Sequence, residues 1–154
     1  RDEPHFPPGG MVYRGAAVDS QKLDFYRRST PGLKFRIPAF VATSFEKRRA
    51  NFFLTRAWEY HQEHTPRDGV MFVISVDPRG EDNDAFRCKN ASLIQARYPG
   101  VPEEHEYLFT QYSVFTLTQF VEKNGTNKDP HEVHLRAAED NRGHAPGLPL
   151  APAV

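Results

Sequence analysis

The clearest sign of fold class is the segment "VPEEHEYLFTQYSVFTL", which runs from Val101 to Leu117. It is rich in aromatic and β-branched residues, which are typical of strands, and a proline near its start favours extended backbone. In a strand the side chains of Glu104 and Glu106 point to the same face, whereas on a helix they diverge by about 200°. Two neighbouring carboxylates repel each other and add nothing to a purely structural strand. They therefore either lie at the solvated end of the strand, where charge costs little, or belong to a site.

The other segments predict an α+β fold. Helical periodicity occurs early, in "QKLDFYRR" after a cap at Asp19–Ser20 and between residues 46 and 64. Strand-like segments are "MVYRGAAV", "LKFRIPAFVATSF" with Pro38 interrupting it, "GVMFVISV", "ASLIQARY" and "HEVHLRAA". Because no regular β-α-β alternation is present, we expect these strands to form a largely antiparallel sheet system.

Length and composition narrow the function classes. A chain of 154 residues fits one domain, with a Pro/Gly-rich lead-in at residues 1–10 and a Pro-rich tail at residues 141–154. Its 20 basic and 20 acidic residues cancel, which argues against a dedicated nucleic-acid binder. No apolar run approaches the roughly 20 residues that cross a bilayer, so we expect no membrane span.

The lone cysteine, Cys88, excludes an internal disulfide and suits a reducing compartment, but the localisation stays open. We expect a monomer.

Several familiar signatures are missing from the chain. It has no glycine-rich dinucleotide fingerprint and no P-loop, which disfavours Rossmann-type and kinase-type sites. The segment "HEVH" at residues 131–134 begins like a zinc-protease helix, but Leu135 stands where the second histidine is required. His61 and His64 share a predicted helix face, yet no third ligand is evident. We therefore expect no metal.

Three predicted strands carry polar residues in a defined order along the chain. Arg14 lies in the first, and Thr43 and Ser44 end another. Glu104 and Glu106 begin a late one. In this order the sequence resembles the ADP-ribosyltransferase family, in the branch marked by an arginine, a serine-threonine-serine strand and glutamate-x-glutamate. The context also matches, with an aromatic residue before the arginine, another two residues before the hydroxyl motif, and a "YLF…VF" pattern after the glutamates.

The resemblance implies both a fold and a reaction. The fold is a split β-sandwich of two roughly perpendicular sheets with flanking helices, and NAD binds in the cleft between the sheets. The reaction is transfer of ADP-ribose from NAD to an arginine side chain of a target protein, with release of nicotinamide.

The same resemblance implies an NAD site. It assigns NAD binding to Tyr13, Arg14, Gly15, Thr43 and Phe53. A guanidinium such as Arg14 can hold the pyrophosphate bidentately, which a lysine does less well. Gly15 would let backbone amides approach the nicotinamide carboxamide. Phe53 belongs to an "AxxF" segment similar to the nicotinamide-stacking segment of the family, and its neighbour Phe52 is a rival for that role.

The resemblance also implies roles for two glutamates in the transfer of ADP-ribose and for one tyrosine in recognition of the target protein. Cleavage of the N-glycosidic bond builds positive charge on the ribose, which Glu106 would stabilise. Glu104, on the same strand face, would orient and help deprotonate the incoming arginine. Tyr98, in the loop "ARYPGVPE", would recognise the target protein.

One residue departs from the family pattern. The hydroxyl strand of the family begins with a serine that contacts the nicotinamide ribose and the catalytic glutamate, and this chain has Ala42 there. Ser44 lies on the same strand face two residues later and is our candidate for that role. Two alternatives to the transferase remain. One is an NAD glycohydrolase that uses water as acceptor, and the other is a catalytically weak NAD- or ADP-ribose-binding module.

Overall fold

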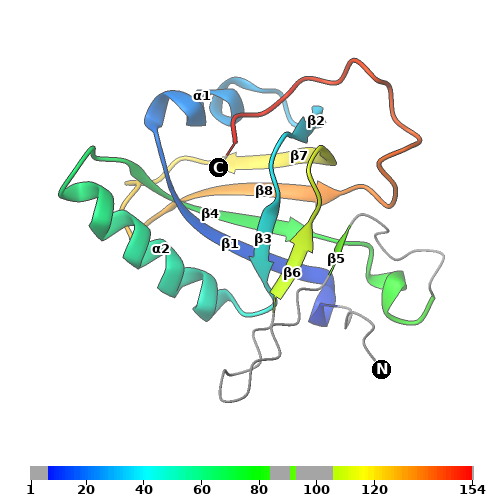
Figure 1. Ribbon diagram of the computed structural model, residues 1–154, viewed down its shortest axis with the longest axis horizontal. Helices are drawn as coiled ribbons and strands as arrows, with labels where there is room; N and C mark the ends of the chain where they lie inside the picture. Colours follow the sequence, from blue (N-terminus) through cyan, green and yellow to red (C-terminus); the bar gives the residue numbers. More distant parts are fainter. Residues whose placement is uncertain (1–6, 84–90, 93–105, 154) are drawn as a thin grey trace.

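The structure, a computed structural model, describes residues 7–83, 91–92 and 106–153 (Figure 1). Its helices are α1 (Ser20–Arg28) and α2 (Lys47–Gln62), and its short 3₁₀ turns are η1 (Pro8–Gly10) and η2 (Pro78–Glu81). Its strands are β1 (Met11–Val18), β2 (Lys34–Ile37), β3 (Val41–Ser44), β4 (Asp68–Ser75), β5 (Ala91–Ser92), β6 (Glu106–Phe109), β7 (Ser113–Val121) and β8 (His131–Ala137). The mixed α+β class expected from the sequence is confirmed.

The strands form one sheet in the order β2-β7-β8-β4-β1-β3-β6-β5. The pairing is antiparallel everywhere except between β4 and β8, which are parallel. The long neighbours β1 and β4 pair along their full length, from Met11 opposite Ser75 to Val18 opposite Asp68. This pair forms the centre of the sheet.

The sheet curls because two chain segments turn sharply between strands. β2 and β3 follow each other in sequence but lie far apart in the strand order, since Pro38 cannot continue a hydrogen-bonded ladder. Their partners β7 and β6 are separated in the same way by a turn in which Tyr112 adopts a φ of 61°. Figure 1 shows β3 and β6 running steeply across the direction of β1 and β4. The expected two separate, perpendicular sheets are not confirmed, because Tyr13 opposite Ser44 joins the two groups of strands into one sheet.

Each helix covers a different face of β4. The side chains of Val70, Phe72 and Ile74 lie in the larger core cluster, which also receives Leu23 and Tyr26 from α1. Met71, which alternates with them along the strand, lies in a smaller cluster with Ala50 and Leu54 of α2. The sheet is therefore a middle layer between the two helices. No helix within the described ranges is long and apolar enough to cross a lipid bilayer.

Tyr26 provides a test of this core. Its ring is fully buried and meets Phe35 and Phe72 edge-on, with centroid distances of 5.7 and 5.8 Å. Its hydroxyl has no hydrogen-bond partner among the described residues, and burial raises its pKa. An unsatisfied buried hydroxyl costs about 1–3 kcal/mol. We expect Tyr26→Phe to leave the free energy of unfolding in urea unchanged or to raise it by roughly 1 kcal/mol. A loss of stability would mean that the hydroxyl has a partner, such as an ordered water.

Candidate active site

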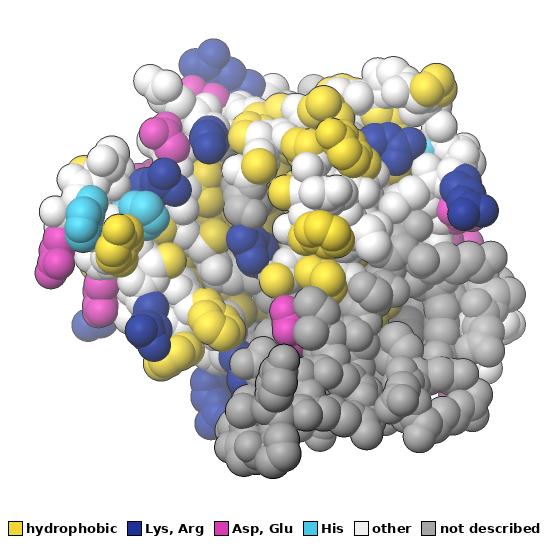
Figure 2. Space-filling model, in the orientation of Figure 1, with side chains coloured by type: hydrophobic (Ala, Val, Ile, Leu, Met, Phe, Trp, Pro, Cys, Tyr) yellow, Lys and Arg dark blue, Asp and Glu magenta, His cyan; other side chains and the backbone are white. Residues whose placement is uncertain are grey.

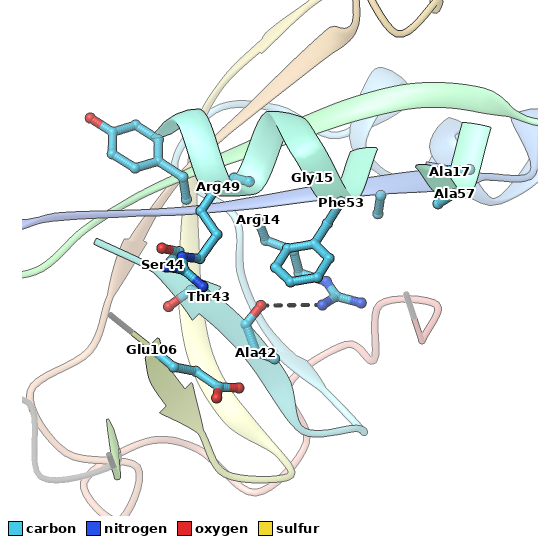
Figure 3. Close-up of a pocket in the computed structure, with 13 residues that line it drawn as sticks. Arg14, Gly15, Ala17, Ala42, Thr43, Ser44, Arg49, Phe53, Ala57 and Glu106 are labelled. Carbon is cyan, nitrogen blue, oxygen red and sulfur yellow. Dashed lines mark hydrogen bonds between the residues drawn. The ribbon is translucent and has the colours of Figure 1, made fainter. Parts of the chain in front are cut away.

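A cavity of about 400 Å³ opens where α2 meets the curled part of the sheet (Figure 3). Its lining residues come from β1, β3, β6 and α2: Tyr13, Arg14, Gly15, Ala16, Ala17, Ala42, Thr43, Ser44, Arg49, Ala50, Phe53, Ala57 and Glu106. The volume lies in the range of small-molecule sites. All three strand motifs singled out in the sequence contribute to this one cavity.

Strand pairing brings Ser44 and Glu106 together. They are direct partners in the antiparallel β3–β6 pair, so their side chains share a face. Ser44 is also the residue that joins β3 to β1, as the partner of Tyr13. Its hydroxyl oxygen accepts a hydrogen bond of 3.1 Å from the backbone N–H of Glu46, just before α2. The serine is thereby fixed at the junction of three elements, and both Ser44 and Glu106 line the cavity (Figure 3).

The two other residues of the hydroxyl motif have different surroundings. Thr43 pairs with Tyr107 on the opposite strand face, and its hydroxyl donates a 2.5 Å hydrogen bond to the Tyr107 carbonyl. That hydroxyl therefore bonds within the sheet, while Thr43 also lines the cavity, and its expected contact with NAD stays a prediction. Ala42 pairs with Leu108. The missing hydroxyl at position 42 thus lies two residue pairs along the ladder from Glu106, whereas Ser44 lies directly opposite it.

Arg14 points its guanidinium into the cavity from β1 (Figure 3). Its Nη1 donates a 3.2 Å hydrogen bond to the carbonyl oxygen of Ala42. Burial lowers the pKa of Arg14 from the ordinary value, because the charged form loses contact with water. The group remains cationic at neutral pH, since an arginine starts so far above it. A partly desolvated cation at the wall of a cavity favours an anionic ligand.

Helix α2 contributes one side of the cavity through residues four apart. Arg49, Phe53 and Ala57 all line it. Phe53 and Phe52 are both about half exposed, but only Phe53 borders the cavity. Phe53 is therefore the ring of the pair that can stack on a bound ligand. Arg49 was not predicted from the sequence, although its i, i+4 spacing to Phe53 places it on the same helix row.

Comparison with known proteins shows which fold this chain has. No protein-family model and no curated protein matches the chain. Among solved structures, it is similar to the ADP-ribosyltransferase Vis of Vibrio splendidus in complex with an inhibitor, with a TM-score of 0.58 at 20% identity. That match covers 84% of this chain and 48% of Vis. The chain has the ADP-ribosyltransferase fold.

Two further structures show the same ADP-ribosyltransferase fold. Vis in complex with agmatine has a TM-score of 0.51 at 19% identity, covering 84% of this chain and 49% of Vis. The ATR domain of Salmonella SpvB has a TM-score of 0.50 at 17% identity, covering 83% of this chain and 61% of that domain. The chain thus spans about half the length of the Vis chains that it matches.

In this ADP-ribosyltransferase fold, Gly15 has a packing role that the sequence did not reveal. A Cβ at this position would lie 2.6 Å from the Cβ of Leu54 and closer still to the carbonyl oxygen of Ala50. The missing side chain therefore makes room for α2, and not only for a ligand in the cavity.

Two residues of the expected site, Glu104 and Tyr98, lie outside the described residues, so their predicted roles stay predictions. Cys88 also lies outside them. Within the ranges that the structure describes, no group of three His, Cys, Asp or Glu side chains could hold a metal ion.

Proposed function

We propose that the chain transfers ADP-ribose from NAD to an arginine side chain of a protein and releases nicotinamide. One observation carries this proposal. A single cavity in an ADP-ribosyltransferase fold is lined by Arg14, Ser44, Phe53 and Glu106, each from a different element. These residues supply a cation for the pyrophosphate, a hydroxyl for the ribose and a flat ring for the nicotinamide. The carboxylate can stabilise the positive charge that develops when NAD is cleaved.

The two walls of the cavity suit different parts of NAD. The guanidinium of Arg14 can hold the pyrophosphate through parallel hydrogen bonds, and the bound anion offsets the cost of desolvating the arginine. The exposed ring of Phe53 offers a stacking surface for the nicotinamide. Between them, Ser44 and Glu106 lie on one face and can reach the ribose hydroxyls.

The chemistry proposed for Glu106 is electrostatic. As the bond between ribose C1′ and nicotinamide breaks, its electron pair stays on the ring nitrogen and positive charge develops on the ribose. A preorganised carboxylate stabilises that charge most strongly when water is excluded. A guanidinium nitrogen of the acceptor then bonds to C1′ and loses a proton, which we assign to Glu104.

Two observations support arginine as the acceptor: the glutamate-x-glutamate motif in the sequence and the solved structure of Vis with agmatine. A planar guanidinium binds a carboxylate through two parallel hydrogen bonds, which suits the first glutamate of the motif, Glu104. Vis, whose fold this chain shares, has been solved with agmatine, which ends in the same guanidinium group as arginine.

A paired assay with labelled NAD tests the function. The chain is incubated with NAD and agmatine, and then with NAD and a protein extract, while nicotinamide release and label incorporation are followed together. Label on agmatine and on protein supports the transferase. Nicotinamide release without label on any acceptor would replace it with the NAD glycohydrolase. NAD binding without turnover would leave a binding module.

Arg14→Lys tests the pyrophosphate contact. Lysine keeps the charge but loses the planar fork, so we expect the Kd for NAD to rise about tenfold or more, which corresponds to about 1.4 kcal/mol. Calorimetric titration with NAD measures this change, and circular dichroism checks the fold. Arg28→Lys, at an exposed position on α1, is the matched control and should leave the Kd unchanged. An unchanged affinity in folded Arg14→Lys would remove Arg14 from the site.

A further inference from the structure

A second row of side chains on α2 runs beside the row that lines the cavity. Its members are again four residues apart, and we call them the rim row: Arg48, Phe52, Arg56 and Tyr60. Residues three and four apart are neighbours on a helix surface, so the rim row runs beside the cavity row of Arg49, Phe53 and Ala57. Figure 2 shows basic and apolar side chains side by side on this part of the surface.

The rim row is unusually exposed for its composition. Arg48 is 93% exposed, Phe52 56% and Tyr60 59%. The Arg56 guanidinium lies over the Phe52 ring at 5.6 Å. A groove of about 470 Å³ is lined by Glu46, Arg48, Arg49, Phe52 and Phe53, and it adjoins the cavity because Arg49 and Phe53 line both.

The charges of this helix face are not explained by the stability of the helix itself. Residues 47–56 contain one lysine, three arginines and no carboxylate. Lys47, Arg48 and Arg49 occupy the first turn, where the positive end of the helix dipole disfavours cations. The neighbouring carboxylate of Glu46 lies 3.9 Å from Arg48, and an exposed pair at that distance contributes little. The stability of α2 therefore accounts neither for the cations in its first turn nor for its exposed rings.

We propose that the rim row docks an acidic segment of the protein acceptor, next to the arginine that is modified. This inference rests on the proposed transferase function and adds the chemistry of the target. Arginine and aromatic side chains are enriched in protein interfaces and carry most of their binding energy. Two arginines alternating with two rings are complementary to carboxylates interspersed with apolar side chains. A segment bound in the groove would lie next to the cavity, because Arg49 and Phe53 line both.

An acidic protein fits this surface better than a nucleic acid does. The chain has zero formal net charge, whereas a nucleic-acid-binding domain normally carries a basic excess. The row also alternates cations with rings along one helix, so its positive charge is confined to a strip beside one cavity.

The test uses acceptors that differ only beside the arginine. Two peptides carry the same arginine flanked either by aspartates or by asparagines, and agmatine serves as an acceptor without flanks. We expect kcat/KM for the aspartate peptide to exceed that for the asparagine peptide by about tenfold and to fall with added salt, as steering by rim charges does. Arg48→Glu should abolish this preference, should favour a third peptide with lysine flanks, and should leave agmatine labelling unchanged.

A control variant and the possible results separate this inference from the proposed function. Arg28→Glu, an exposed arginine on α1, should keep the wild-type preference. If agmatine is labelled but the peptides do not differ, or if Arg48→Glu slows every acceptor equally, the docking role of the rim row is wrong. Preferential labelling of RNA or DNA over the aspartate peptide would also overturn it. If wild-type protein labels neither agmatine nor any peptide, the proposed transferase function itself fails.

Discussion

Glu106→Gln is expected to lower the rate of nicotinamide release by about a thousandfold, or roughly 4 kcal/mol of transition-state stabilisation. Glutamine has the same shape as glutamate but no charge, so the variant removes the electrostatic attraction to the developing ribosyl cation. Ser44 and the β3–β6 pairing remain in place, because they depend on the backbone and not on the carboxylate. Nicotinamide release in a single turnover measures the effect, and calorimetry should show nearly unchanged NAD affinity.

The same assay distinguishes the roles of the two glutamates. Glu104→Gln removes only the group proposed to ready the arginine, so transfer to agmatine should fall steeply while hydrolysis of NAD continues. Glu63→Gln, at the far end of α2 from the first turn, is the matched control and should behave as wild type. Near-normal nicotinamide release in Glu106→Gln would show that the catalytic assignment is wrong. Equal loss of transfer and hydrolysis in Glu104→Gln would mean that the carboxylates act as one unit.

The sequence predicted local structure well where a residue limits the backbone. Pro38 ends β2 before β3 begins, and the Asp19 side chain accepts a hydrogen bond from the Gln21 N–H at the start of α1. The sequence of β6 and β7 is consistent with one strand or with a hairpin. It could not predict that β6 pairs with β3 and β7 with β2, instead of with each other. Strand composition indicates extended backbone but not its partners, and partner choice produces the curl that closes the cavity.

The candidate site was predicted only where chemistry is visible in single residues. Arg14, Ser44 and Glu106 carry groups that the proposed cleavage of NAD needs, and all three line one cavity. Arg49 was missed because the periodicity of α2 shows which residues share a row, but not which element each row faces. That choice depends on the packing angle between α2 and β1, which is determined by contacts distant in sequence.

Gly15→Ala is expected to reduce the free energy of unfolding by about 3 kcal/mol, at or above the upper end of the range for overpacked cores. The added methyl would lie 2.6 Å from the Cβ of Leu54, which is fully buried, and against the backbone carbonyl of Ala50. Neither group can rotate away, because one is helix backbone and the other is held in the core. The helix itself must move, and such a loss is a large part of the roughly 5–15 kcal/mol that keeps a domain folded.

The position of α2 also links this packing to the proposed activity. The helix carries Arg49, Phe53 and Ala57 into the cavity, so its displacement would change one wall of the site. Denaturation of Gly15→Ala in urea, without NAD, measures the packing effect alone. Gly143→Ala is the control, since a Cβ there meets nothing within 4 Å, and it should keep wild-type stability. If Gly15→Ala kept its stability and lost only NAD affinity, the glycine would serve the ligand and not the helix, and the close contact between β1 and α2 would not be what requires it.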